Sequence, residues 1–78
     1  MIDLLKTIQA TITSGDESGY VAECREIAIV TQGRTLDEVT FNLREAVALY
    51  FEGENPIHFG FSEKPSLVIT IELQPAYA

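Results

Sequence analysis

Helical periodicity is confined to one stretch of this 78-residue chain, and that limits the folds open to it. Apolar residues recur there at three- and four-residue steps, at Leu36, Val39, Leu43, Val47 and Tyr50. Thr35 and Glu38 have the spacing of a capping box, and Gly53 suits a left-handed C-terminal cap. We therefore expect a helix from about Leu36 to Glu52. A helix of this length is marginal alone in water, so its apolar side needs a sheet to pack on.

Four other segments have the character of β-strands, because they alternate in polarity or are rich in β-branched residues. They are residues 4–13, 20–25, 27–31 and 67–73. The first two flank a turn rich in glycine and serine, so we expect them to form an antiparallel hairpin. Gly33 follows the third strand, where we expect a turn with positive φ.

The resulting order, β-β-β-α-β, predicts a single α+β domain over residues 1–78. The simplest architecture is a three-stranded antiparallel sheet with the helix across one face. The final strand then lies beside the others, and the helical connection allows it to run parallel to a neighbour. The second face of the sheet is mostly polar, so it can remain in solvent or meet a partner.

The formal charge of −7 comes from 12 acidic and 5 basic residues. It argues against binding to nucleic acid or to an anionic membrane, and it suits either solubility or a basic protein partner. The single cysteine, Cys24, excludes an internal disulfide and fits a reducing cytosol. No apolar run near the N-terminus is long enough for a signal peptide or a membrane span, so we expect a cytoplasmic protein.

Residues that could support catalysis are few. The chain has one histidine, His58, and no grouping that suggests a nucleophile with its base. Glu54 precedes His58 by four residues, but Pro56 lies between them, so we do not expect a helical pair. We expect no enzymatic activity, no cofactor and no metal site. A small hydrolase or metal-binding domain stays an alternative that rests on His58 alone.

The segment 54–66 is irregular but unusually apolar. A connector of this kind packs either over its own core or against a second subunit. A small domain without disulfides or metals is commonly stabilised by oligomerisation. We therefore predict a homodimer or higher oligomer, with Ile57, Phe59 and Phe61 at the interface.

Several short motifs occur in a recognisable order. They are Gly19-Tyr20-Val21-Ala22, Thr31-Gln32-Gly33, Thr35-Leu36-Asp37-Glu38, Asn42-Leu43 and Glu45-Ala46. In this respect the chain resembles the HicB-like antitoxin domain. One segment departs from the family: residues 25–29 contain no proline or glycine, where the family usually has a Pro-x-Leu-Pro-Gly-like loop.

The resemblance implies a partial ribonuclease-H-like fold and an antitoxin function. Such a protein would neutralise a small basic ribonuclease toxin by covering its active site and RNA-binding surface. Many family members continue into a DNA-binding domain, whereas this chain ends after its fourth predicted strand, so we expect no operator binding. For the toxin contact we predict the residues Asp16, Glu17, Glu23, Arg25 and Glu26. The alternative is a stand-alone homo-oligomeric interaction domain without a toxin partner.

Overall fold

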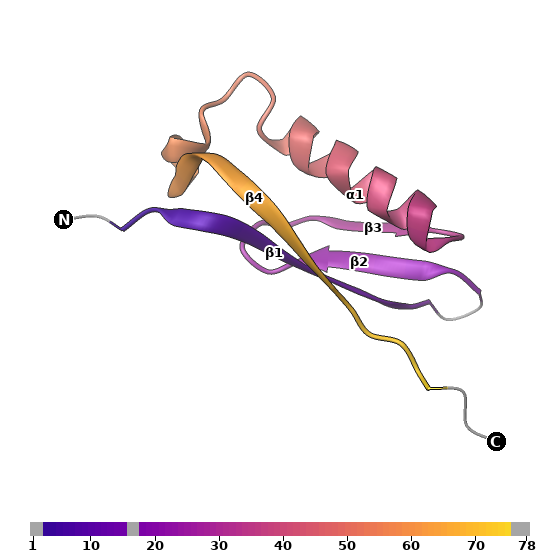
Figure 1. The fold of residues 1–78 in the computed structure, drawn as a ribbon. Coiled ribbons are helices and arrows are strands. Elements are labelled where there is room, and N and C mark those ends of the chain that lie inside the picture. The colour runs from indigo at the N-terminus through magenta and orange to yellow at the C-terminus, as the bar shows by residue number, and fades with distance from the viewer. Residues whose placement is uncertain (1–2, 16–17, 76–78) are drawn as a thin grey trace.

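A four-stranded mixed sheet carries one helix in this computed structural model, which describes residues 3–15 and 18–75 (Figure 1). The elements are β1 (Leu5–Ser14), β2 (Tyr20–Cys24), β3 (Val30–Gly33), α1 (Leu36–Tyr50), the 3-10 helix η1 (Pro56–Phe59) and β4 (Phe61–Ile71). The predicted α+β class and the order β-β-β-α-β are therefore confirmed.

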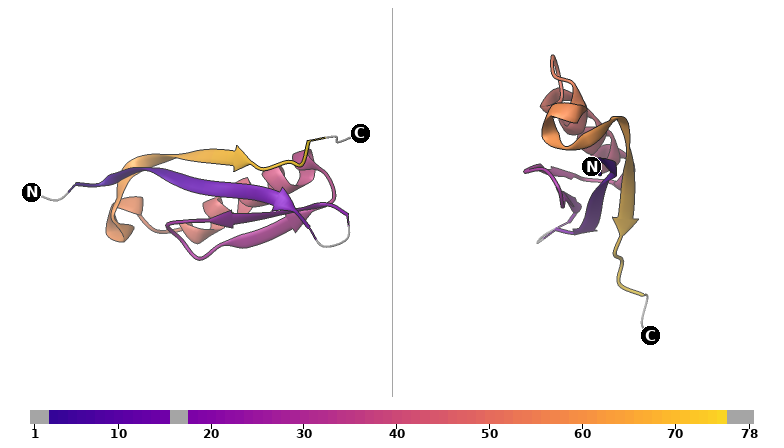
Figure 2. Two further views of the ribbon diagram at one scale, coloured as in Figure 1. Left: turned by 90° about the horizontal axis from the view of Figure 1, so that it is seen from below. Right: turned by 90° about the vertical axis from the view of Figure 1, so that its left-hand side faces the viewer.

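The strands lie in the order β3-β2-β1-β4. β1 and β2 are antiparallel, as are β2 and β3, whereas β4 runs parallel to β1. Seen from below, the strands lie in front of the helix (Figure 2). The helix thus occupies one side of the sheet, and β3 and β4 form its two edges.

The core lies between the helix and the central strands. It consists of Ile8, Ala10, Ile12, Ala22, Cys24, Ile27, Ile29, Val39, Leu43 and Phe61. Most of the apolar stripe predicted for the helix faces the core, because Val39 and Leu43 are buried and Leu36 and Val47 are half-buried, whereas Tyr50 is 38% exposed. The alternate β1 residues Ile8, Ala10 and Ile12 belong to the same core. α1 packs mainly over β3 and β2, which leaves the helix side of β4 only partly covered.

The helix begins as its sequence predicts and ends slightly early. Thr35 Oγ1 accepts a hydrogen bond from Glu38 N at 3.0 Å. The Glu38 carboxylate, however, accepts from Arg34 N at 3.1 Å, one residue before the expected partner. The helix ends at Tyr50, two residues before the predicted end, and Gly53 adopts a φ of 75° in the turn that follows.

The third strand differs from the prediction. β3 covers Val30–Gly33 instead of residues 27–31. Ile27 and Ile29 belong to the connection from β2, and both are buried there. This connection folds inward, with Ile29 O accepting a hydrogen bond from Cys24 N at 3.0 Å. An apolar run predicts that the side chains are buried, but a buried connection and a buried strand share that property. The run at residues 27–29 therefore belongs to a connection, although its sequence resembles a strand.

The fourth strand begins at Phe61, six residues before the predicted Leu67. The pairing with β1 passes from Leu5–Phe61 directly to Thr7–Ser66. Residues 62–65 thus bulge opposite Lys6, and Pro65 lies within the bulge. A bulge tolerates proline because the residues in it do not take part in the regular ladder.

Gly33 is required for a different reason from the predicted one. The glycines with positive φ are Gly19, Gly53 and Gly60 among the described residues, and Gly33 is not one of them. A Cβ atom on Gly33 would lie 2.4 Å from Val39 N and 2.7 Å from Val39 Cα. The end of β3 can therefore approach the first turn of the helix only without a side chain.

Candidate protein-interaction surfaces

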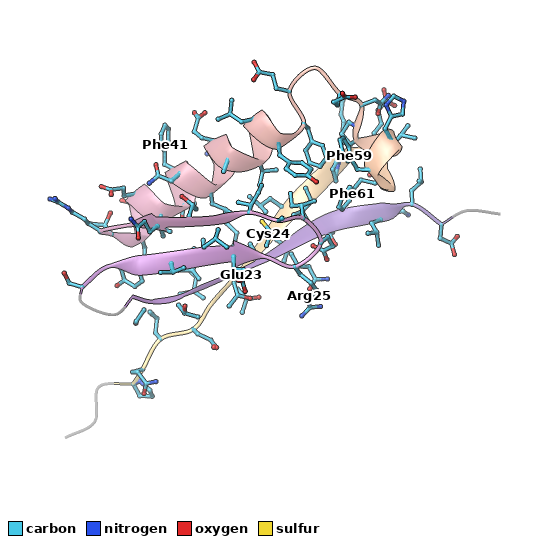
Figure 3. The ribbon with its side chains drawn as sticks, turned by 180° about the vertical axis from the view of Figure 1, so that it is seen from behind. Glu23, Cys24, Arg25, Phe41, Phe59 and Phe61 are labelled. Carbon is cyan, nitrogen blue, oxygen red and sulfur yellow. The ribbon has the colours of Figure 1, made fainter. Side chains whose placement is uncertain are left out.

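The open face of the sheet carries two of the residues predicted to bind a partner. Glu23 in β2 lies opposite Thr11 in β1 and opposite Val30 in β3, and all three side chains are exposed. Arg25 follows two residues later on the same face. Figure 3 shows Glu23 and Arg25 away from the helix, with Cys24 between the sheet and the helix. The structure therefore leaves both charges in solvent.

Cys24 is a core residue and not a surface thiol. Its side chain is 7% exposed. Burial raises the pKa of the Cys24 thiol above its ordinary value, and the nearby carboxylate of Glu26 raises it further. Both effects keep the thiol protonated near neutral pH, so Cys24 acts as a small apolar side chain.

Glu26 has a structural role that its sequence position did not suggest. Its Oε1 atom accepts a hydrogen bond from Gln9 N at 2.7 Å, while Arg25 N donates to Gln9 O at 2.8 Å. The carboxylate thus takes the place of a strand partner just where β2 ends. This leaves Glu23 and Arg25 as the exposed members of the predicted edge. The other two predicted residues, Asp16 and Glu17, lie outside the described part of the chain.

The predicted oligomer interface is only partly at the surface. Phe61 is 1% exposed and belongs to the core of the protomer, so assigning it to an interface was wrong. Ile57 and Phe59 are each 42% exposed. The Phe59 ring contacts Tyr50 and Phe51, with centroids 5.4 and 5.5 Å apart. The connector thus packs on its own core and also leaves apolar surface.

His58 and Glu54 lie closer together than the intervening proline suggests. His58 Nδ1 is 3.7 Å from Glu54 Oε2. The 3-10 turn that begins at Pro56 makes this possible, because proline is acceptable in the first turn of a helix. Both side chains are more than half exposed. No group of three or more potential metal ligands occurs in residues 3–15 and 18–75.

The outer side of the helix contains a surface that the sequence analysis missed. Phe41 is 60% exposed and Leu49 is 63% exposed. Phe41 projects away from the sheet (Figure 3). Glu45 lies between them at four-residue steps, and it is exposed as well. The sequence signal for this surface was Phe41, a large aromatic residue about half a helical turn away from the apolar stripe.

A broad hollow beside the helix N-terminus is lined by residues of β2, β3 and the first turns of α1. Two of its polar side chains make local hydrogen bonds. Asn42 Nδ2 donates to Gln32 O at 2.8 Å, and Glu38 caps the helix. Asn42 thereby joins the helix to β3. Glu38 and Asn42 therefore stabilise the helix start and its contact with β3.

No protein-family model matches the sequence. No curated protein and no solved structure matches it either. Within the described residues, no helix is long and apolar enough to cross a membrane.

Proposed function

We propose that this protein is a non-enzymatic antitoxin-type protein that binds and neutralises a small basic ribonuclease. The motifs between Gly19 and Phe51, which resemble the HicB-like antitoxin domain, support the proposal. The single observation that carries it from the structure is the outer side of α1. There an exposed aromatic residue stands among carboxylates.

The charge around this surface has one predominant sign. Between Asp37 and Glu54 the chain has five carboxylates and one arginine, all exposed. Phe41 and Leu49 supply apolar area in the same region. Buried aromatic anchors contribute much of the affinity of protein interfaces, and complementary charge speeds and orients association. This combination suits a basic protein that has an apolar hollow.

Inhibition would follow from covering the partner's surface. A ribonuclease binds RNA phosphates through lysine and arginine side chains. Carboxylates such as Glu45 would pair with those cations, and the bulk of the helix would exclude RNA from the site. This chain then makes and breaks no covalent bond.

The test needs a small basic protein encoded beside this gene as the candidate partner. The two are co-purified, and the dissociation constant and the residual ribonuclease activity are measured. Phe41→Ala should weaken binding roughly 30-fold, as truncation of an interface anchor costs about 2 kcal/mol. Glu45→Lys should weaken it as well, with a larger effect at low salt.

Glu23→Lys is the matched control, because it makes the same charge change on the opposite face of the molecule. If Glu23→Lys alone abolishes binding, the partner meets the sheet face, as the sequence suggested. If the neighbouring protein neither binds nor is inhibited, or if no such neighbour exists, the antitoxin proposal is overturned.

A stand-alone homo-oligomeric interaction domain is the second candidate. The exposed Ile57 and Phe59 favour it, since both lie on an apolar connector. Sedimentation should then show a stable oligomer, and Phe59→Ser should dissociate it. A monomer, or an oligomer that persists in Phe59→Ser, would show that this connector is not an oligomer interface.

A further inference from the structure

β4 forms a sheet edge whose outward main-chain groups have no partner among the described residues. Glu72 N donates to Ile12 O at 2.9 Å, so the main chain of Glu72 faces β1. Successive residues of a strand direct their main-chain groups to opposite edges. Val68 and Thr70 therefore also face β1, whereas Leu67, Ile69 and Ile71 direct their N–H and C=O groups outward.

This part of the edge lacks the usual protection against pairing. Exposed edges are commonly guarded by lysine, proline, a bulge or short length. In β4 those guards are all upstream, where Lys64 and Pro65 lie in the bulge. Residues 66–71 are uncharged and contain no proline. The opposite edge, β3, is only four residues long.

The side chains of this segment are also incompletely covered. Val68 on the open face is 47% exposed, and Ile71 on the helix side is 45% exposed. Leu67 and Ile69 share the helix side with Ile71 and are only partly buried. The helix lies over β2 and β3, so an apolar strip remains beside β4.

We infer that a second copy of this chain pairs antiparallel with β4, residue Ile69 facing its own counterpart, so that one sheet continues through both protomers. This inference does not depend on the antitoxin proposal. In this register the outward N–H and C=O groups of Leu67 bond to those of Ile71 in the other copy. Ile69 bonds to Ile69, and Pro65, which has no N–H, is not needed.

The segment is nearly symmetric in character about Ile69, which favours a second copy over an unrelated strand. Leu67 would lie beside Ile71, and Val68 beside Thr70. Glu72 would lie opposite the uncharged Ser66 of the other copy. Two chains that each carry a formal charge of −7 can therefore meet without opposed carboxylates along this segment.

Hydrogen exchange of the unmodified protein tests the pairing directly. The protein should be a dimer in sedimentation equilibrium at about 100 μM, a concentration at which micromolar dimers are populated. The outward amides of Leu67, Ile69 and Ile71 should exchange at least ~100-fold more slowly than unstructured amides. A monomer overturns the inference, as does a dimer in which these amides exchange freely.

Proline substitution then locates the interface. Ile71→Pro removes an outward N–H without breaking the ladder to β1, so it should give a folded monomer. Val30→Pro is the matched control. Ile29 O bonds back to Cys24 N, so Val30 N–H also points outward, but on the β3 edge. Val30→Pro should leave the dimer intact. A dimer that survives Ile71→Pro but is lost on Val30→Pro or Phe59→Ser overturns the inference.

Discussion

At the scale of single residues, Gly33 shows how one position can couple two elements. The β3 strand ends against the first turn of α1, and the gap between them is too small for a methyl group. The sequence marks Gly33 as a turn residue, but it does not show why glycine is needed at this position. A glycine before a helix is compatible with positive φ or with close packing, and only the position of Val39 distinguishes the two.

Gly33→Ala should therefore destabilise the protein by about 1–3 kcal/mol, since the helix must move away from β3. Gly15→Ala is the control, because the nearest atom to its added Cβ is 3.7 Å away and its φ is not positive. Urea unfolding followed by circular dichroism measures both. Equal stability of the two variants would contradict the packing explanation.

Glu26 and Asn42 have structural roles that could not be predicted from the sequence. Glu26 was assigned to a partner because acidic residues in a loop are commonly exposed. Its hydrogen bond to Gln9 N joins residues seventeen positions apart. Asn42 likewise reaches a carbonyl ten positions away. Such contacts depend on tertiary proximity, which periodicity does not encode.

At the scale of elements, the helix has one face that packs on the sheet and one face that is exposed to solvent. Its apolar stripe was predictable because burial on a sheet requires steps of three and four residues. Its outer face has no such requirement, so the exposed Phe41 and Leu49 stand out as candidates for binding. The same helix therefore allows a comparison of buried and exposed leucines.

Leu43→Ala should cost about 2–5 kcal/mol, because Leu43 is fully buried and its removal leaves a cavity. Leu49→Ala should change stability by less than about 0.5 kcal/mol, because that side chain is 63% exposed. Thermal unfolding of both variants checks the difference. A large loss of stability in Leu49→Ala would mean that the outer face is already packed in the folded protein.

The two strands with misplaced boundaries share one cause. Ile27 and Ile29 are as apolar as strand residues, yet they fill the core from a connection. Phe61 was placed in the irregular segment 54–66, which ends just after Pro65. A bulge opposite Lys6 accommodates that proline. The local sequence predicts which side chains are buried. Whether the backbone that carries them is a strand, a bulge or a connection depends on its pairing with the neighbouring strand.

At the scale of the whole molecule, one helix covers only part of a four-stranded sheet. α1 lies over β2 and β3, so the sheet is poorly covered at β4 and exposes apolar side chains there. A small domain gains stability when a second copy extends its sheet and covers such a strip. Folding and association are then linked.

Linkage predicts that thermal stability depends on protein concentration. A tenfold increase should raise Tm by about 3–5 °C, because each dimer gains about 1.4 kcal/mol by mass action. Calorimetry over a hundredfold concentration range measures the shift. The Ile71→Pro variant should show no such dependence, whereas Val30→Pro should retain it. A Tm independent of concentration in the unmodified protein would contradict the linkage.

The sequence by itself determined the α+β class, the order of elements, the helix start at Thr35 and the inward faces of β1 and α1. These follow from local rules of capping and periodicity, which act within a few residues. Only the tertiary structure decided that β4 pairs with β1 in parallel and stands at an edge. It also decided that Phe61 is core, that Glu26 completes a strand and that Phe41 is exposed. Those outcomes depend on which distant segments meet, and local periodicity contains no information about that choice.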